Sequence, residues 1–266
     1  MEEEIYRVEG VGFSYGGVPA LDDISFIVRR GESLAVLGAN GTGKSTLLKI
    51  LNGLIFPASG SVRFRGGLLT EGAIKRPFRL SVGFVFSEPD VQLFSPTVYD
   101  EVAFGPLQTG LSTGEVKKRV GDVLEMLGIA PLKQRAPFRL SGGEKKKVAI
   151  ASVLSLNPDV LLLDEPTAAL DPRTQVWLLE LLGELKRIKK TFIIATHDLS
   201  FAEDISERVV VLDESHRLSA DGPAEQVLKD KALLLRANLI HEHAHRHGAI
   251  THIHSHGPFS RHDEHD

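Results

Sequence analysis

The stretch GANGTGKST at 38–46 decides the fold class of this chain. The fixed positions of the pattern G-x-x-x-x-G-K-[ST] are filled by Gly38, Gly43, Lys44 and Ser45. The apolar run 33–37 before it is typical of a buried strand, and 46–51 after it is typical of a helix. A glycine-rich turn between strand and helix presents backbone N–H groups to phosphate oxygens. The sequence therefore predicts a phosphate-binding loop in which Lys44 reaches the terminal phosphates and Ser45 binds Mg²⁺.

The composition excludes several classes of protein. The chain has 266 residues, 42% of them hydrophobic, and a formal net charge of −4. It can form a sizeable core, and it lacks a basic footprint for nucleic acid. It has no cysteine, which excludes disulfides and thiolate metal sites. No apolar run reaches the roughly 18 residues that span a bilayer, and the N-terminus lacks a signal-peptide core. We expect a soluble, cytoplasmic chain that acts at a membrane only through a partner.

Strand and helix patterns alternate along the chain and predict an α/β fold. Residues 5–30 hold short alternating runs typical of an antiparallel sheet. Strand patterns then occur at 33–37, 62–64, 82–86, 160–163, 192–195 and 209–212, and helix patterns at 46–51, 144–155 and 173–188. This order predicts a mostly parallel sheet with helices on both faces.

Two segments depart from that alternation. Between 97 and 140, apolar residues recur at helical spacing and are interrupted at Gly105-Pro106, Gly110 and Gly128, which predicts an inserted helical subdomain at about 92–145. The last 26 residues hold nine of the eleven histidines and few apolar residues. We therefore expect a domain over 3–240 and an unpacked, flexible tail over 241–266.

Two further motifs carry chemistry. VLLLDEP at 160–166 is an apolar run that ends in two acids, as when a buried strand delivers carboxylates to the ligand-binding edge of a parallel sheet. Asp164 would bind Mg²⁺ through water, and Glu165 would orient the attacking water as a base. LSGGE at 140–144 predicts a helix that begins after Ser141 and receives anions. Taken alone, LSGG predicts only an N-capped helix.

The order of these motifs, with ALD at 169–171 and THD at 196–198, resembles the ATP-binding cassette family, the nucleotide-binding subunits of ABC transporters. The likeness covers about residues 3–235 and implies a P-loop NTPase core that hydrolyses ATP with Mg²⁺. It implies catalytic roles for Glu165, for the switch histidine His197 and for Lys44. For ATP binding it implies Tyr15 (adenine), Gly38, Asn40, Gly41, Gly43, Lys44, Ser45 and Thr46 (phosphates), and Ser141, Gly142 and Gly143 (the ATP of the opposite subunit). It assigns Asp171 to communication across a dimer.

This chain departs from the family pattern at two positions. Glu144 ends the signature where the family usually has Gln, and a carboxylate is favourable at a helix start. Ser87 stands where the family has a Gln that touches Mg²⁺ and the attacking water. Because serine is shorter, it would act at Mg²⁺ only through a bridging water.

The segments EPDVQLF at 88–94 and DEVAFGP at 100–106 resemble the ATPase subunits of energy-coupling-factor importers. In that subgroup this segment, here including Gln92, Leu93 and Phe94, meets the membrane subunit. Such importers carry vitamins or nickel and cobalt. The tail offers imidazoles, which suit Ni²⁺ and Co²⁺, at His241, His243, His245, His247, His252, His254 and His256.

We therefore predict a peripheral ATPase on the cytoplasmic face of the cell membrane that powers nickel or cobalt import. Its expected partners are integral membrane subunits and a second ABC ATPase, in a homodimer or heterodimer. One alternative is another ABC importer, such as a vitamin energy-coupling-factor system. A soluble metallochaperone NTPase is a further alternative, but it would lack LSGGE and would need a guanine-reading N-K-x-D motif that this sequence does not have. A DNA-repair ATPase would carry a long coiled-coil insertion.

Overall fold

The structure is a computed structural model that describes residues 3–247 and 250–256. From His241 onward only the backbone is described. The chain divides into two compact units, which are considered separately below. The first unit comprises Met1–Leu69 with Ile194–Asp266, and the second comprises Thr70–Ile193.

An antiparallel sheet begins the first unit, as the sequence predicts. It has the order β2-β1-β4-β5, with β1 (Glu4–Tyr15), β2 (Val18–Arg29), β4 (Ser59–Phe64) and β5 (Gly67–Leu68). The neighbouring strands β1 and β4 approach each other closely at Gly60, where a Cβ would lie 2.2 Å from the carbonyl oxygen of Gly10. With its φ of 75°, this position accepts glycine far more readily than other residues.

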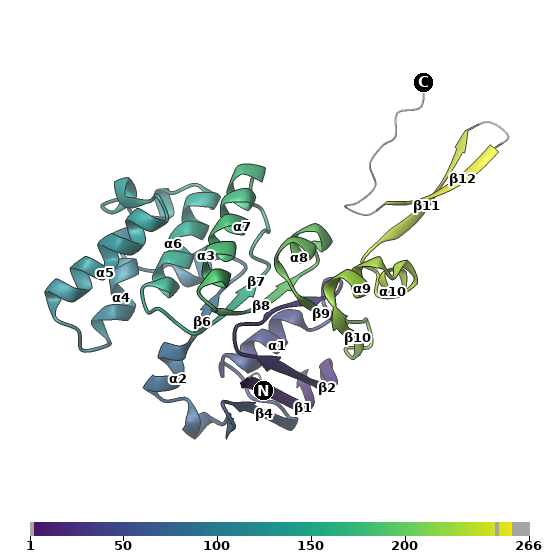
Figure 1. Cartoon of the computed structure of the whole chain (residues 1–266), viewed down its shortest axis with the longest axis horizontal. Helices are drawn as coiled ribbons and strands as arrows, with labels where there is room; N and C mark the ends of the chain where they lie inside the picture. Colours follow the sequence, from purple (N-terminus) through teal and green to yellow (C-terminus); the bar gives the residue numbers. More distant parts are fainter. Residues whose placement is uncertain (1–2, 248–249, 257–266) are drawn as a thin grey trace. The chain divides into compact units, whose positions relative to one another are not determined.

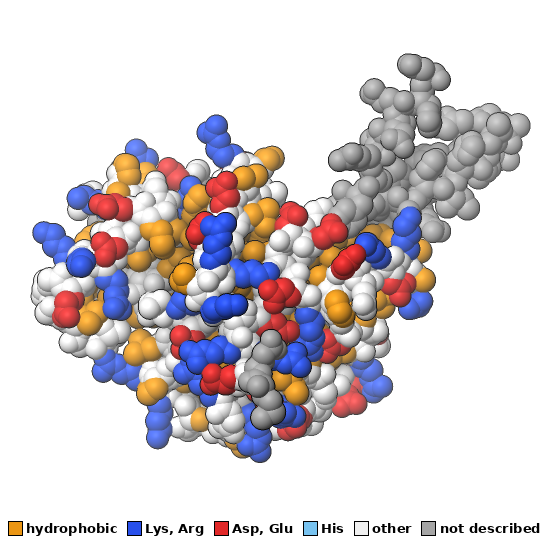
Figure 2. Space-filling view, in the orientation of Figure 1, with side chains coloured by type: hydrophobic (Ala, Val, Ile, Leu, Met, Phe, Trp, Pro, Cys, Tyr) orange, Lys and Arg blue, Asp and Glu red, His pale blue; other side chains and the backbone are white. Residues whose placement is uncertain are grey.

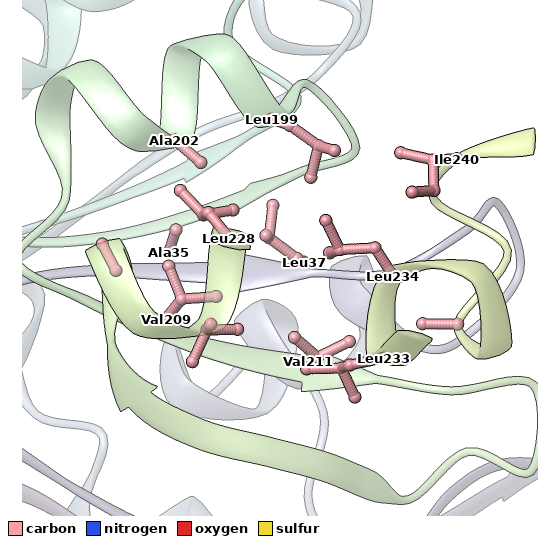
Figure 3. Packing of buried hydrophobic residues seen from close by; sticks show 13 residues of the cluster. Ala35, Leu37, Leu199, Ala202, Val209, Val211, Leu228, Leu233, Leu234 and Ile240 are labelled. Atoms are coloured by element: carbon pink, nitrogen blue, oxygen red, sulfur yellow. The ribbon is translucent and has the colours of Figure 1, made fainter. Parts of the chain in front are cut away.

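The first unit also contains one half of a six-stranded sheet. Its strands β3 (Ser33–Leu37), β9 (Arg208–Leu212) and β10 (Leu218–Pro223) are neighbours in the order β10-β9-β3, and β3 runs parallel to β9. The helices of this unit are α1 (Lys44–Leu51), α8 (Leu199–Ile205), α9 (Ala224–Lys229) and α10 (Lys231–Arg236). Apolar side chains from α8, α9 and α10 pack on β3 and β9, and this cluster ends at Ile240 (Figure 3).

The second unit holds the other strands of that sheet, β6 (Val82–Val85) and β7 (Val160–Asp164), with β8 (Thr191–Thr196) running across the boundary between the units. β6 and β7 are parallel, and Val85 pairs with Leu163. All residues of β6 and β7 are buried, as the continuous apolar runs predict for parallel strands. The carboxyl ends of β6 and β7 therefore lie together at one edge of the sheet.

Helices make up most of the second unit (Figure 1). They are α2 (Arg76–Ser81), α3 (Pro89–Gln92), α4 (Val98–Leu107), α5 (Thr113–Met126), α6 (Gly142–Leu154) and α7 (Pro172–Arg187), with short 3₁₀ turns at Glu71–Ala73, Ala130–Leu132 and Pro137–Arg139. The predicted interruption at Gly105-Pro106 is wrong, because α4 continues to Leu107. Gly105 has a packing role instead, since a Cβ there would come within 2.9 Å of the Leu156 side chain.

The backbone after Ile240 forms two antiparallel strands, β11 (His241–His247) and β12 (Ile250–His256). The sequence predicts an unpacked tail here. The backbone hairpin differs from that prediction. Among the residues that the structure describes, none of the helices is long and apolar enough to cross a membrane. On the face shown in Figure 2, basic and acidic side chains are interspersed.

Candidate active site

The predicted phosphate-binding loop joins β3 to α1 in the first unit. Gly43 precedes the helix with a φ of 106°, and a Cβ there would lie 2.0 Å from the carbonyl oxygen of Ala20. At Gly38 a Cβ would meet the Thr42 hydroxyl at 2.4 Å. These two positions cannot hold a side chain without a shift of the surrounding chain, so the loop keeps bare backbone at the start of α1. The first N–H groups of a helix have no acceptor within it, which makes this end suitable for anions.

Lys44 lies within the curve of this loop. Its Nζ donates to the carbonyl oxygens of Gly38 at 2.8 Å and Ala39 at 3.2 Å. The side chain is buried, so its charge is held at the loop instead of extending into solvent. Within the loop, the Thr42 hydroxyl donates to the Ala39 carbonyl at 3.0 Å.

Tyr15, the predicted adenine-stacking residue, lies at the end of β1. Its ring is 47% exposed and packs edge-on against Phe13, with centroids 4.9 Å apart. The Thr46 hydroxyl donates to the Tyr15 hydroxyl at 3.5 Å, so these two predicted ATP-binding residues are neighbours. A ring that is half exposed beside the loop is able to stack on a base.

His197, the predicted switch histidine, is exposed immediately after β8. The backbone around it is well fixed. Asp198 caps α8 by accepting a hydrogen bond from Phe201 N–H at 3.0 Å, and Asp198 N–H donates to the Thr196 hydroxyl at 3.0 Å. The strand end and the helix cap therefore hold His197 in a short, ordered turn of the first unit.

In the second unit, the parallel strands bring Ser87 and the two predicted acids to one edge. Asp164 is the last residue of β7 and is buried, and Glu165 follows it. Ser87 follows the neighbouring strand β6 by two residues and is half-buried. Glu165 has a φ of 41°, a left-handed conformation that is unfavourable for a residue with a side chain. Such strain costs about 1–3 kcal/mol and is often found at functional sites.

The signature segment begins α6 as predicted, and Glu144 suits it. The Ser141 hydroxyl accepts a hydrogen bond from Glu144 N–H at 3.3 Å, and the Glu144 carboxylate accepts one from Ser141 N–H at 2.8 Å. This reciprocal pair is a capping box. The hydrogen bond from the Ser141 backbone holds the pKa of Glu144 below its ordinary value. A carboxylate thus fills the position where the family usually has an amide.

Asp171 and Gly143 are brought together in the second unit. Asp171 caps α7, and its carboxylate accepts hydrogen bonds from Thr174 N–H at 3.1 Å and from the Thr174 hydroxyl at 2.7 Å. These bonds lower the pKa of Asp171, so it is a carboxylate at neutral pH. A Cβ on Gly143 would lie 2.9 Å from the Thr174 hydroxyl and 3.6 Å from Asp171. The bare backbone at the start of α6 therefore lies beside the start of α7.

Lys146 is a residue that the sequence analysis missed. It lies on α6, is buried, and donates from Nζ to the carbonyl oxygens of Ser87 at 2.7 Å and Phe86 at 3.2 Å. Desolvation lowers its pKa to about 8, while Asp164 and Glu165 act in the opposite direction. In the sequence it is the middle of three consecutive lysines, a pattern typical of a solvated helix face. Only its spacing of three, four and seven residues from the apolar Ala149, Ile150 and Val153 could have indicated burial.

The chemistry of these residues fits ATP and Mg²⁺. The loop of the first unit offers a helix start with bare backbone, a lysine and the Ser45 hydroxyl. Considered by itself, the strand edge of the second unit offers the Asp164 carboxylate. Oxygen ligands of this kind are those that Mg²⁺ prefers. Of the seven tail histidines predicted as metal ligands, the backbone places His241, His243, His245 and His247 on β11 and His252, His254 and His256 on β12. Among side chains that the structure describes, there is no group of three or more His, Asp and Glu residues able to hold a metal ion.

Comparisons with known proteins agree with the family resemblance. A family profile described as ABC transporter matches residues 21–168. An ABC transporter ATP-binding protein of Methanosarcina acetivorans is 54% identical, with 92% of each chain covered. The nickel import ATP-binding protein NikO of Rhodobacter capsulatus is 49% identical, over 88% of this chain and 95% of that protein. The structure of cbiO1 from Clostridium perfringens, part of the ABC transporter complex cbiONQ, superimposes with a TM-score of 0.77 at 40% identity, over 90% of this chain and 96% of cbiO1.

Proposed function

The chain belongs to the ABC transporter family of ATPases, and from that premise we propose that it powers import of nickel or cobalt through membrane partner subunits. The observation that supports a metal cargo is the backbone register of the terminal hairpin. Three histidine pairs face each other across it: His241 with His256, His243 with His254, and His245 with His252. The relative NikO, a nickel import ATP-binding protein, agrees with this choice.

In the proposed reaction, the loop before α1 binds the phosphates of ATP, and Tyr15 stacks on the adenine. Lys44 supplies positive charge to the terminal phosphates, and Asn40, Gly41 and Thr46 complete the loop. Mg²⁺, when bound, would neutralise the charge that develops on the transferred phosphoryl group. Ser45 and Asp164 would hold it, and Ser87 would contact it only through a water.

Glu165 is the proposed general base. It accepts a proton from the attacking water, and His197 contacts the terminal phosphate of the nucleotide. The strained backbone of Glu165 is compatible with this role, because left-handed conformations of non-glycine residues occur at active sites as well as in turns.

The signature helix would act on a second ATPase chain. Ser141 and Gly142 are exposed and Gly143 is half-buried at this capped helix start, and Asp171 lies beside Gly143 as an exposed carboxylate. We propose that these residues cover the ATP of the opposite subunit in a homodimer or heterodimer. Hydrolysis would then separate the two chains and drive the membrane subunits.

A surface of the second unit fits a membrane partner. A groove of about 400 Å³ is lined by Phe94, Phe104, Arg76, Arg79 and Leu156, among others. Phe94 is 68% exposed and packs edge-on against Phe104 at 5.0 Å, so two aromatic rings form an anchor at this surface. Docking there would hold the chain on the cytoplasmic face of the membrane as a peripheral subunit.

The backbone register of the hairpin leads to a specific hypothesis about which tail histidines bind metal. Residues at alternate positions of a strand share one face, so the three His–His pairs belong to a single face of the hairpin. We propose that these paired positions bind the metal, because imidazole is a ligand that suits Ni²⁺ and Co²⁺. His247 is opposite Ile250 and has no histidine partner in this register.

The main alternative is an ATPase of another ABC importer, such as a vitamin system. Uptake measurements separate the two. Cells that lose this chain should take up less radioactive nickel or cobalt, and the wild-type chain, but not Glu165→Gln, should restore uptake. Loss of vitamin uptake with unchanged metal uptake would favour the alternative and refute the proposed cargo. A soluble metallochaperone NTPase is disfavoured, since family membership already accounts for the signature segment.

A further inference from the structure

The segment that follows β6 is held by one helix, α6. Lys146 donates to the carbonyl oxygens of Phe86 and Ser87, at 3.2 and 2.7 Å. Gln92, at the end of the short helix α3, accepts from Phe86 N–H at 3.2 Å and donates to the α6 carbonyl of Ala149 at 2.8 Å. The side chains of Lys146 and Gln92 therefore bind four backbone groups. Three belong to the segment after β6, and the fourth is the Ala149 carbonyl of α6.

The burial of Lys146 is costly and needs compensation. Its side chain is 1% exposed, and taking an ammonium out of water is expensive unless hydrogen bonds and opposite charges replace the water. Two backbone carbonyls supply the hydrogen bonds, and Asp164 and Glu165 lie close enough to interact with its charge. All five residues belong to the second unit. Lys146 is thus hydrogen-bonded to the strand end that carries Ser87 and interacts electrostatically with the acids at the end of the neighbouring strand.

We infer that Lys146 is a positioning residue for ATP hydrolysis, which from α6 fixes the backbone at Ser87 with respect to the Asp164–Glu165 pair. This inference rests on the proposed role of Glu165. It explains how the site functions with serine at position 87. A short side chain can act through a bridging water only if its backbone is held still, and Lys146 holds the carbonyl of that same residue. Misplacement of a catalytic group by about 1 Å can cost about 100-fold in rate.

The chain offers a matched control on the same helix. Lys147 is the next residue of α6, and its ammonium lies over the Trp177 ring, 4.4 Å from the centroid. Lys146→Met and Lys147→Met remove the same charge from adjacent positions. Lys146→Arg keeps the charge and the donors and serves as the conservative variant.

Two readouts test the inference, one of them without ATP. Backbone amide hydrogen exchange over 86–92 in the nucleotide-free chain should be faster by at least about tenfold in Lys146→Met, since hydrogen bonds to a charged group are lost. The kcat for ATP should fall by at least about tenfold while KM changes less than about threefold, because the phosphate loop is intact. Lys147→Met should match wild type in both, and Lys146→Arg should recover most of the lost rate.

Exchange and kcat in Lys146→Met equal to those in Lys147→Met would overturn the inference. If Lys146→Met does not fold, as judged by thermal melting, Lys146→Gln takes its place, since it keeps a donor without the charge, and the same two readouts decide. Glu165→Gln separates this inference from the proposed function. Normal turnover in Glu165→Gln would reject the base, whereas the exchange experiment would still decide whether Lys146 fixes the segment.

Discussion

Gln92 Oε1 accepts a hydrogen bond from the backbone N–H of Phe86 at 3.2 Å, so a side chain of α3 closes the end of β6. Its Nε2 donates to the Ala149 carbonyl at 2.8 Å and to the Ser152 hydroxyl at 3.1 Å. The sequence assigned Gln92 to the segment that meets the membrane subunit. Its half-buried side chain also links two elements of the second unit. Among the large apolar residues of the segment, Val91 and Phe94 are exposed.

Gln92→Ala should therefore lower the free energy of unfolding by about 1–3 kcal/mol, because it leaves a partly buried N–H group and a carbonyl without their partner. Urea unfolding of the isolated chain measures this. Gln108→Ala is the matched control, since Gln108 is exposed at the end of α4 and should change stability by less than about 0.5 kcal/mol. Equal stability of the two variants would show that the Gln92 hydrogen bonds are energetically unimportant.

Glu165→Gln should keep ATP binding and abolish turnover, because an amide cannot accept the proton of the attacking water. The closed dimer should accumulate with ATP, since opening depends on hydrolysis. Lys44→Ala should instead weaken ATP binding itself, because the charge over the phosphates is removed. Fluorescent-nucleotide binding, phosphate release and size-exclusion chromatography distinguish the two variants. Hydrolysis near the wild-type rate in Glu165→Gln would reject Glu165 as the base.

Ser87→Ala should reduce kcat by about two- to tenfold, as loss of one hydrogen bond of about 0.5–1.5 kcal/mol implies. Ser87→Gln should be tolerated and should raise the rate, because the amide reaches without a bridging water. Ser81→Ala is a suitable control: Ser81 lies before the opposite end of β6, and its hydroxyl donates to the Pro77 carbonyl at 2.9 Å. If Ser87→Ala has no effect at any Mg²⁺ concentration, Ser87 takes no part in the site.

Local patterns in the sequence predicted much of the fold. The strand, glycine turn and helix at 33–51 were predictable because the steric demands at Gly38 and Gly43 restrict the residue type directly. The N-terminal antiparallel sheet was predictable from the alternation of apolar and polar residues, and the parallel core strands from their continuous apolar runs. Long-range packing was not. Gly105 lies against the Leu156 side chain inside a helix, although a glycine in a helical pattern suggests that the helix is interrupted there.

Part of the candidate site also depends on contacts distant in sequence. Nothing near Lys146 in the chain indicates that its ammonium meets the carbonyls of Phe86 and Ser87, because these residues are 60 and 59 positions away. The roles of His197 and Asp171 came from the family resemblance, and that of Glu165 came from the motif at 160–166 as well; all three stay predictions. Helices α8 to α10 are each only six or seven residues long, too short to show a clear helical period in the sequence.

Phe94→Ala should leave basal ATP hydrolysis of the isolated chain unchanged and reduce assembly with the membrane subunits. The reason is that Phe94 is 68% exposed, so the substitution removes little packing except the contact with the Phe104 ring. Co-purification of membrane subunits measures assembly. Met126→Ala, which removes another exposed side chain from α5, is the control and should assemble normally. Loss of basal ATPase activity together with thermal stability in Phe94→Ala would show that the ring is needed for folding instead.

A chain that ends at Ile240 should fold and hydrolyse ATP, because the last side chain of the buried cluster in the first unit is Ile240 itself. The full chain should bind more than one Ni²⁺ or Co²⁺ by calorimetry, and the truncated chain almost none, although it keeps His197 and His216. Binding should weaken as pH falls through roughly 6.5, since protonated imidazoles no longer coordinate metal.

The register sharpens this test. Replacing the six paired histidines by alanine should abolish most metal binding, whereas replacing His262 and His265, which lie outside the described residues, should leave most of it. Transport should fall in the six-alanine variant chiefly when external metal is scarce, because capture then limits the flux. Equal metal stoichiometry in the full chain and the six-alanine variant would exclude the hairpin as the binding site and reopen the choice of cargo.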